Sequence, residues 1–184
     1  MNSPNQWQDD VIRFWFEELQ PQVWFERNTQ VDATIAERFS GLHQRLSKSV
    51  GTSEIANARE ALATVIVLDQ FSRNLFRGSA QAFATDQRAL AIAQQAVERG
   101  WDQELSKDQR LFLYMPFQHA EDRAVQERSM DLFTALGDAQ TLDYARRHKE
   151  VIDRFGRYPH RNKILGREST PEEIEFLKQP GSGF

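Results

Sequence analysis

Residues 54–75 read EIANAREALATVIVLDQFSRNL, and this stretch decides the fold because it predicts a helix that is buried on nearly every side. Leu62 and Ile66 mark one apolar stripe at helical spacing, and further apolar residues cover the opposite side. At 100° per residue, Asp69 and Arg73 continue that stripe. A helix that is apolar nearly all round lies at the centre of a domain. We therefore expect a carboxylate and a guanidinium, one turn apart, in the interior.

Helical spacing recurs on both sides of this segment, and no strand-like alternation interrupts it. Residues at the predicted helix starts indicate N-caps at Ser53 and Thr85 and a capping box at Thr170 and Glu173. At the predicted helix ends, Gly100 and Gly156 indicate left-handed caps, and Pro116 indicates an end or a kink. We expect the other helices over residues 11–19, 32–48, 86–99, 106–116, 122–136 and 141–155, with a short one after the capping box.

These helices, about eight in number, predict an all-α fold of stacked antiparallel helix pairs. Residues 136–138 (LGD), Ala145 and Pro159 resemble the second half of one tetratricopeptide unit, which predicts tetratricopeptide-like, right-handed superhelical packing. No 34-residue period runs through the chain. A length of 184 residues fits one domain, residues 1–184, with a frayed tail at 181–184.

The composition excludes several classes of site. The chain has no cysteine, so disulfides, thiolate metal sites and cysteine nucleophiles are ruled out, and we expect a cytoplasmic protein. Asp9 and Asp10 stand where a signal peptide would be basic and then apolar, so no signal peptide is expected. The longest apolar run, residues 61–68, is far shorter than the roughly 20 residues of a membrane span, so we expect no membrane association.

Charge is concentrated in one region of the chain. The net charge is -4, yet residues 146–163 hold seven Lys or Arg against two acidic residues, a local charge of +5. A short basic segment in an acidic chain favours a small anion or an acidic partner over a long polyanion. We therefore predict a small anionic ligand and do not expect nucleic-acid binding, although RNA contact through this basic corner is a further, weaker reading.

Asp69, Gln70, Arg73 and Asn74 form the first candidate group for ligand binding. If the Asp69–Arg73 pair is exposed, it contributes only about 0.3 to 0.5 kcal/mol, and the two amides are simply solvated. If it is buried, as the apolar stripe indicates, Asp69 would hold Arg73 in one rotamer and present its planar donor fork to an anion.

The second group, His119, Glu121 and Asp122, follows Pro116. Acidic residues are favourable in a first helical turn, so Glu121 and Asp122 are explained equally well by the helix that follows, with His119 in the turn. In the functional interpretation, His119 and Glu121 are a coupled catalytic pair, because a nearby carboxylate orients an imidazole and raises its pKa. Asp122 is then a ligand-binding residue.

The third group is His148 with the corner formed by Arg157, His160, Arg161 and Asn162. His148 is predicted either as an interior histidine bonded to a carbonyl or as a catalytic residue. The arginines either cap the carbonyls of the preceding helix or bind the anion. His160 is predicted to be catalytic and Asn162 to bind the ligand, because the helix end at Gly156 and the Pro159 turn present them from a stiff, non-helical corner.

No cofactor can be assigned from the sequence. Three histidines near carboxylates would suit zinc or iron, but no metal-ligand spacing is present, so we predict no metal site. Phosphate-binding loops, dinucleotide-binding glycine patterns and nucleophile elbows are also absent. Whether the chain is an enzyme stays open at this point.

The three groups carry a resemblance to a known family. The chain resembles the bacterial domain-of-unknown-function family 924, whose characteristic segments match residues 69–74 (DQFSRN), 115–122 (MPFQHAED), 155–162 (FGRYPHRN) and 165–167 (LGR), with further matches at residues 14–16, 24–25 and 170–173. The resemblance implies a cytoplasmic all-α protein with tetratricopeptide-like helix packing and no established activity.

The leading hypothesis joins the three groups in one pocket for a small anionic molecule. Asp69 orients Arg73, Arg157 and Arg161 bind the anion, and a histidine donates or shuttles a proton. The alternative is a tetratricopeptide-like protein–protein interaction module, in which the same polar residues form an internal network that sets helix register.

Overall fold

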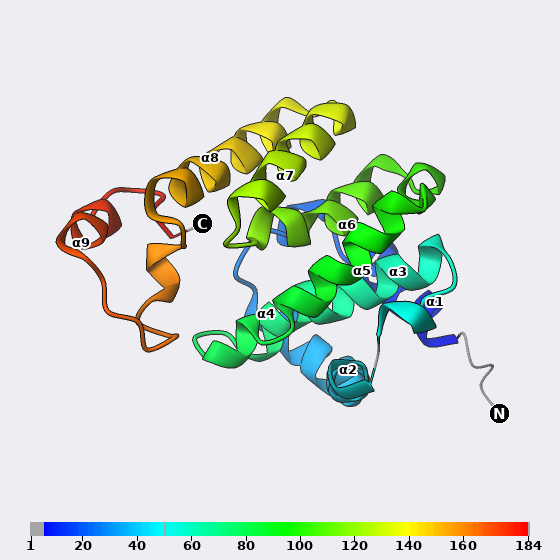
Figure 1. Cartoon of the computed structure of the whole chain (residues 1–184). Coiled ribbons are helices and arrows are strands. Elements are labelled where there is room, and N and C mark those ends of the chain that lie inside the picture. The colour runs from blue at the N-terminus through cyan, green and yellow to red at the C-terminus, as the bar shows by residue number, and fades with distance from the viewer. Residues whose placement is uncertain (1–5, 50, 184) are drawn as a thin grey trace. The chain divides into compact units, whose positions relative to one another are not determined.

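The computed structural model describes residues 6–49 and 51–183, and within them every regular element is helical (Figure 1). The all-α prediction is confirmed for this part of the chain. The α-helices are α1 (Gln6–Arg13), α2 (Thr29–Ser49), α3 (Ala58–Val65), α4 (Ser72–Leu75), α5 (Asp86–Glu98), α6 (Lys107–His119), α7 (Arg123–Leu136), α8 (Ala139–Phe155) and α9 (Pro171–Leu177). The predicted frayed tail includes Phe184, which lies outside the described residues.

The chain forms two compact units, which are described separately. Unit 1 comprises the chain up to Arg77 together with Gln81–Pro116, and unit 2 comprises Gly78–Ala80 with the chain from Phe117 onward. The expectation of a single domain stays a prediction, as does the tetratricopeptide-like superhelix. Among the described helices, none combines the length and apolar character needed to cross a membrane.

The central helix of unit 1 begins at Ala58, four residues later than predicted. Ser53 does not cap it but lies in a 3-10 turn, Thr52–Glu54. Asn57 is the N-cap, because its side chain accepts a hydrogen bond of 2.9 Å from the backbone N–H of Glu60. The burial prediction is confirmed for Asp69, since every side chain from Ala61 to Asp69 is completely buried, whereas the Arg73 side chain is 21% exposed.

Between α3 and α4 the helix widens into a π-helical segment, η4 (Ile66–Phe71), which the sequence did not predict. A second π segment, η1 (Phe14–Glu18), extends α1. The two segments meet in an aromatic core, where Trp15 packs against Phe71 and Phe112 at centroid distances of 5.7 and 5.4 Å. All of η4 therefore lies in the interior of unit 1, together with Phe14 and Trp15 of η1.

The predicted capping bond of Thr85 and the predicted helix end at Pro116 are both absent, and each absence has a physical reason; a kink at Pro116 stays a prediction. Thr85 precedes α5 but makes no capping bond, because its hydroxyl donates instead to the carbonyl of Leu68 at 2.6 Å. Pro116 does not end α6, which continues to His119. Proline removes only its own N–H, so the residues after it can remain helical.

The left-handed ends at Gly100 and Gly156 are confirmed, with φ of 70° and 71°.

Unit 2 is built on the helical hairpin of α7 and α8, which lie side by side (Figure 1). Its buried apolar cluster consists of Val151, Ile152 and Tyr158, with Phe155 and Phe176 packed against it. Phe176 belongs to α9, whose predicted capping box is present. The segment after α8 is thus attached to the hairpin by its apolar residues.

Candidate functional site

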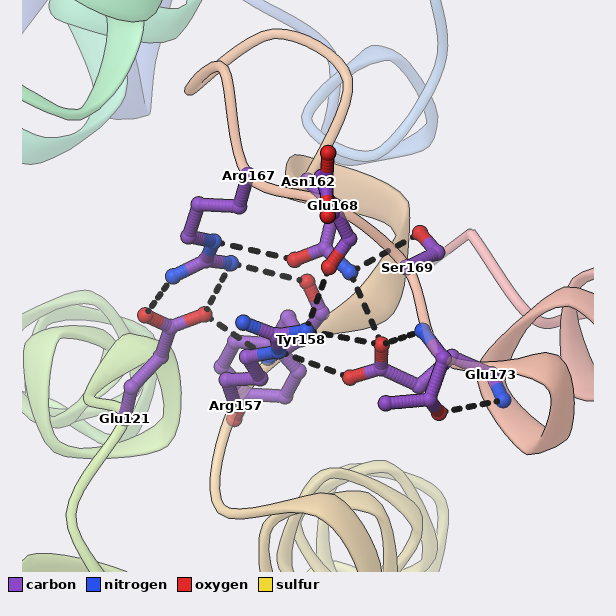
Figure 2. Close-up of polar contacts among 9 residues, drawn as sticks. Glu121, Arg157, Tyr158, Asn162, Arg167, Glu168, Ser169 and Glu173 are labelled. Atoms are coloured by element: carbon purple, nitrogen blue, oxygen red, sulfur yellow. Dashed lines mark hydrogen bonds and ion pairs between the residues drawn. The ribbon is translucent and has the colours of Figure 1, made fainter.

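The corner after α8 contains a network of carboxylates and guanidinium groups (Figure 2). Glu121 accepts two hydrogen bonds from Arg167, at 2.7 and 2.9 Å, and a third from the backbone N–H of Tyr158 at 2.7 Å. Burial by itself would raise the pKa of Glu121, but these bonds outweigh burial and hold the pKa below its usual value. Glu121, predicted as a partner of His119, is therefore an ionised structural anchor for the loop.

Glu173 forms the second carboxylate pair of this corner. It accepts bonds of 2.7 and 2.8 Å from Arg157 and one of 2.8 Å from the backbone N–H of Thr170. Its side chain is only 3% exposed. Hydrogen bonding to Arg157 is the main reason that the pKa of Glu173 falls to about 2. The Arg157 fork, which was predicted to bind an anion, thus holds a carboxylate of the chain itself.

Asn162 connects the two pairs. Its amide nitrogen donates to Glu173 at 3.2 Å and to Ser169 at 3.0 Å, and its amide oxygen accepts from Arg167 at 2.9 Å (Figure 2). Arg167 and Glu173 were not predicted as site residues. The glutamate was assigned only to the capping box, and Arg167 was recorded only as part of the family resemblance. A network of this kind is what the interaction-module alternative predicts.

Asp122 likewise has a structural role. Its side chain accepts a hydrogen bond of 2.9 Å from the N–H of Val125 and caps α7. This is the favourable first-turn position that the sequence analysis weighed against ligand binding.

Two of the four histidines lie against Tyr158 and a third lies beside one of them. Sequence reasoning did not single out Tyr158 as a site residue. The His148 and His160 rings lie 5.6 and 5.7 Å from the Tyr158 ring, and His119 lies 6.4 Å from His148. Arg161 completes the set, because its guanidinium lies over the Tyr158 ring at 4.6 Å and donates to the carbonyl of His119 at 3.1 Å. We call His119, His148, Tyr158, His160 and Arg161 the histidine cluster.

The Tyr158 ring is held in place from the α6 end. Its hydroxyl donates to the carbonyl of Gln118 at 2.6 Å and accepts from Gln126 at 2.9 Å. Gln126 is fully buried, and its amide nitrogen also reaches the carbonyl oxygens of Gln118 and Ala120 at 2.9 and 2.8 Å. The end of α6 and the ring of Tyr158 therefore share one buried polar anchor.

His148 is neutral under ordinary conditions. Its Nδ1 lies 2.8 Å from the carbonyl of Tyr144, and a carbonyl can only accept, so Nδ1 carries the proton and Nε2 is left as an acceptor. The pKa of His148 falls to about 3, mainly because the ring is buried, and positive charge on His119, Arg161 and His160 contributes to the decrease. His148 is thus the interior, carbonyl-bonded histidine of the first sequence interpretation, and its catalytic role stays a prediction.

The first predicted group lies in unit 1, where Asp69 is completely buried. Arg73 donates to the Asp69 carbonyl at 2.8 Å and lies 3.4 Å from its carboxylate. The two-pronged contact of Arg73 is with Asp86, at 2.9 and 3.1 Å, a partner that the sequence did not suggest. Gln70 donates to Asp69 at 2.6 Å, and Asn74 donates to Asp32 at 2.7 Å.

The structure thus brings together the second and third predicted groups within unit 2. The first group forms its own network in unit 1, so the pocket that combines all three stays a prediction. Within the described residues, no set of three or more histidine, aspartate or glutamate side chains could hold a metal ion. Arg154 and Lys149, also in the basic segment, are paired on the surface with Glu172 and Asp153.

The sequence matches a known protein family, and the fold matches a solved structure. The sequence profile of a family described as bacterial protein of unknown function (DUF924) matches residues 11–181. A solved protein of unknown function from Agrobacterium tumefaciens is similar in structure, with a TM-score of 0.86 and 41% sequence identity over 96% of this chain and 99% of that chain. A search of curated proteins finds no match.

Proposed function

Because this chain belongs to the DUF924 family of bacterial proteins of unknown function, its role has to be argued from its side chains, and we propose that the histidine cluster binds a small anionic ligand. The family resemblance expected from the sequence is confirmed, and it assigns no activity. In this proposal Arg161 attracts the anion, and His119 or His160 shares a proton with it. The observation that carries the proposal is that two histidines and an arginine lie against one buried tyrosine, with a third histidine beside His148.

The electrostatics of the cluster support an anion over a cation. Arg161, together with His119 and His160 when they are protonated, lowers the pKa of His148, so positive charge collects around this imidazole. An arriving negative charge offsets that positive charge and raises the pKa of each neighbouring imidazole. Anion binding and proton uptake are therefore coupled in this proposal, which is how acid/base chemistry would arise.

The arrangement of the two other arginines supports Arg161 as the anion-binding residue. Arg157 and Arg167 each donate two hydrogen bonds to a glutamate, and these two ion pairs hold the loop together. Arg161 stacks on Tyr158 and donates to the carbonyl of His119, and these contacts keep its planar group in one orientation within the histidine cluster. Loop stability and ligand binding are thus assigned to different arginines.

Inorganic phosphate provides the first test. We expect phosphate to raise the melting temperature of the protein above that measured in chloride at equal ionic strength, and to raise the pKa values of His119 and His160 measured by NMR. Arg161→Gln should abolish both effects, whereas Arg161→Lys, which keeps the charge, should retain part of them.

Arg147→Gln is the matched control, because Arg147 lies on α8 with its side chain 60% exposed and pairs with Asp143. It should respond to phosphate like the parent. If phosphate moves neither the melting temperature nor the histidine resonances of the parent, the proposal is wrong. The internal network of Glu121, Arg157, Arg167 and Glu173 would then support the interaction module as the better account of these polar residues.

A further inference from the structure

A hollow in the surface of unit 1 lies outside every site discussed so far. It has a volume of about 500 Å³ and is formed by α2, the end of α4 and the segment before α5. The lining residues carry no formal charge; they are Ser40, Gly41, His43, Gln44, Ser47, Leu75, Phe76, Gln81, Ala84 and Thr85. A charged ligand would lose hydration there without gaining an opposite charge. The lining therefore fits a neutral molecule with an apolar body.

His43 provides the hollow with one oriented polar group. Its Nε2 lies 2.7 Å from the hydroxyl oxygen of Ser72, and that hydroxyl donates its proton to the carbonyl of Leu68 at 2.6 Å. A serine has one proton, so Ser72 accepts from the imidazole, and Nε2 of His43 is protonated. Nδ1 of His43 then has a lone pair for a ligand that carries an O–H or N–H group. Burial lowers the pKa of His43, which keeps the ring neutral.

Thr85 holds this arrangement from the other side. Its hydroxyl lies 2.8 Å from that of Ser72 and donates to the same Leu68 carbonyl. This explains why Thr85 does not cap α5: its hydroxyl bonds the Leu68 carbonyl and contacts Ser72, which orients His43. Ser72 and Thr85 are fully or nearly fully buried, so the orientation of the imidazole is set by the core of unit 1.

Gly41 is a second, independent observation. It lies in the middle of α2, where glycine is less stable than alanine by about 1 kcal/mol. A Cβ added at Gly41 would meet no atom within 4 Å, so packing against the protein does not require glycine. Gly41 lines the hollow. An absent side chain at this wall leaves space for something that is not part of the described chain.

We propose that this hollow binds a neutral small molecule with an aromatic or similarly compact apolar ring, whose single O–H or N–H group donates to Nδ1 of His43. The apolar walls at Leu75 and Phe76 contact the ring. Gly41 allows the ring to approach the backbone of α2. This site is independent of the histidine cluster, and either proposal can fail without the other.

Phenol, anisole and benzoate form a matched set of probes. Phenol has the ring and the donor, anisole blocks the donor with a methyl group, and benzoate adds a charge. In ¹H–¹⁵N correlation spectra of the protein, we expect phenol to shift the amides of Gly41, Gln44 and Thr85 saturably, with at least tenfold weaker binding of anisole and benzoate. Phenol should also shift the Nδ1 resonance of His43.

Gly41→Leu tests the location, because its side chain would fill the hollow while the fold is maintained and the melting temperature is at least that of the parent. Ala36→Leu adds the same side chain at an exposed position of α2 that does not line the hollow, and it should bind phenol like the parent. Saturable phenol binding that is lost only in Gly41→Leu supports the site. The proposal is overturned if the parent shows no saturable shift, if Gly41→Leu binds phenol unchanged, or if anisole or benzoate binds as well as phenol.

Discussion

His148 and Glu173 are both nearly inaccessible to solvent, yet their partners leave them in different charge states. His148 has a carbonyl partner and positive neighbours, so the neutral ring is favoured and its pKa falls to about 3. Glu173 has Arg157 against it, so the charged carboxylate is favoured and its pKa falls to about 2. Both groups bind protons more readily in the unfolded chain, which makes stability rise with pH in two separate windows.

The upper window belongs to His148. Its pKa is about 3 in the folded protein and returns to the ordinary histidine value near 6.5 on unfolding, so its contribution to stability is complete above pH 6.5 and is lost as the pH falls toward 3. We expect His148→Asn, which keeps a donor for the Tyr144 carbonyl, to flatten the dependence of unfolding free energy on pH between 7 and 5, by at most about 1.4 kcal/mol per pH unit. Urea unfolding at several pH values measures it.

Glu173→Gln is the comparison variant, because the contribution of Glu173 is complete above pH 4.5 and is lost only between about 4.5 and 2. It should leave the upper window unchanged. His43 also has a lowered pKa and contributes in the same direction as His148, so some dependence should survive in His148→Asn. A His148→Asn protein with the full parental slope would contradict the assignment.

At the scale of elements, Gly41 and Gly156 show why two glycines of similar exposure have opposite roles. Gly41 is inside α2, and Gly156 ends α8 with a φ of 71°. We expect Gly41→Ala to stabilise the protein by about 1 kcal/mol through helix propensity. Gly156→Ala should destabilise it by about 1 to 2 kcal/mol, because a Cβ is strained in the left-handed region.

Thermal and urea unfolding of the two variants check the glycine prediction. Neither added Cβ would meet an atom within 4 Å, so steric overlap does not confound the comparison. Equal effects of the two substitutions would show that backbone conformation is not what separates them. The change in unfolding free energy for Gly41→Ala also measures how much glycine at the wall of the hollow lowers the stability of the protein.

Element boundaries were predictable where they depend on neighbouring residues. The αL glycines and the Thr170 capping box bond backbone groups at the helix ends that lie only three or four residues away along the chain. All of them were found as expected. The π segment η4 was not, because its extra residue per turn is maintained by packing of a fully buried helix and not by a local motif. Thr85 was misassigned for the same reason, since its partner, Leu68, is 17 residues away.

At the scale of the whole molecule, α6 links the two units. One boundary between them falls between Pro116 and Phe117, inside the continuous helix Lys107–His119. Unfolding either unit therefore removes part of the hydrogen bonding of α6 from the other. We expect one cooperative thermal transition, with calorimetric and van't Hoff enthalpies equal, as the prediction of a single domain requires.

Differential scanning calorimetry tests this expectation directly. Residue-resolved hydrogen exchange is the complementary measurement, and the slowest amides of α3 and α8 should report the same opening free energy. Two resolved transitions, or a large difference between those amides, would show that the units are separate domains.

The sequence by itself determined the helical class, most helix ends and which polar residues stand out, because these depend on periodicity and on bonds between residues three or four apart. Tertiary structure decided the partners. Arg157 pairs with Glu173, Glu121 with Arg167, and Arg73 with Asp86, at separations of 16, 46 and 13 residues. Charge pairing depends on distance in space, which helix packing sets. The same packing brought Tyr158 among the histidines and placed His43 beside Ser72, and no spacing in the chain indicates either.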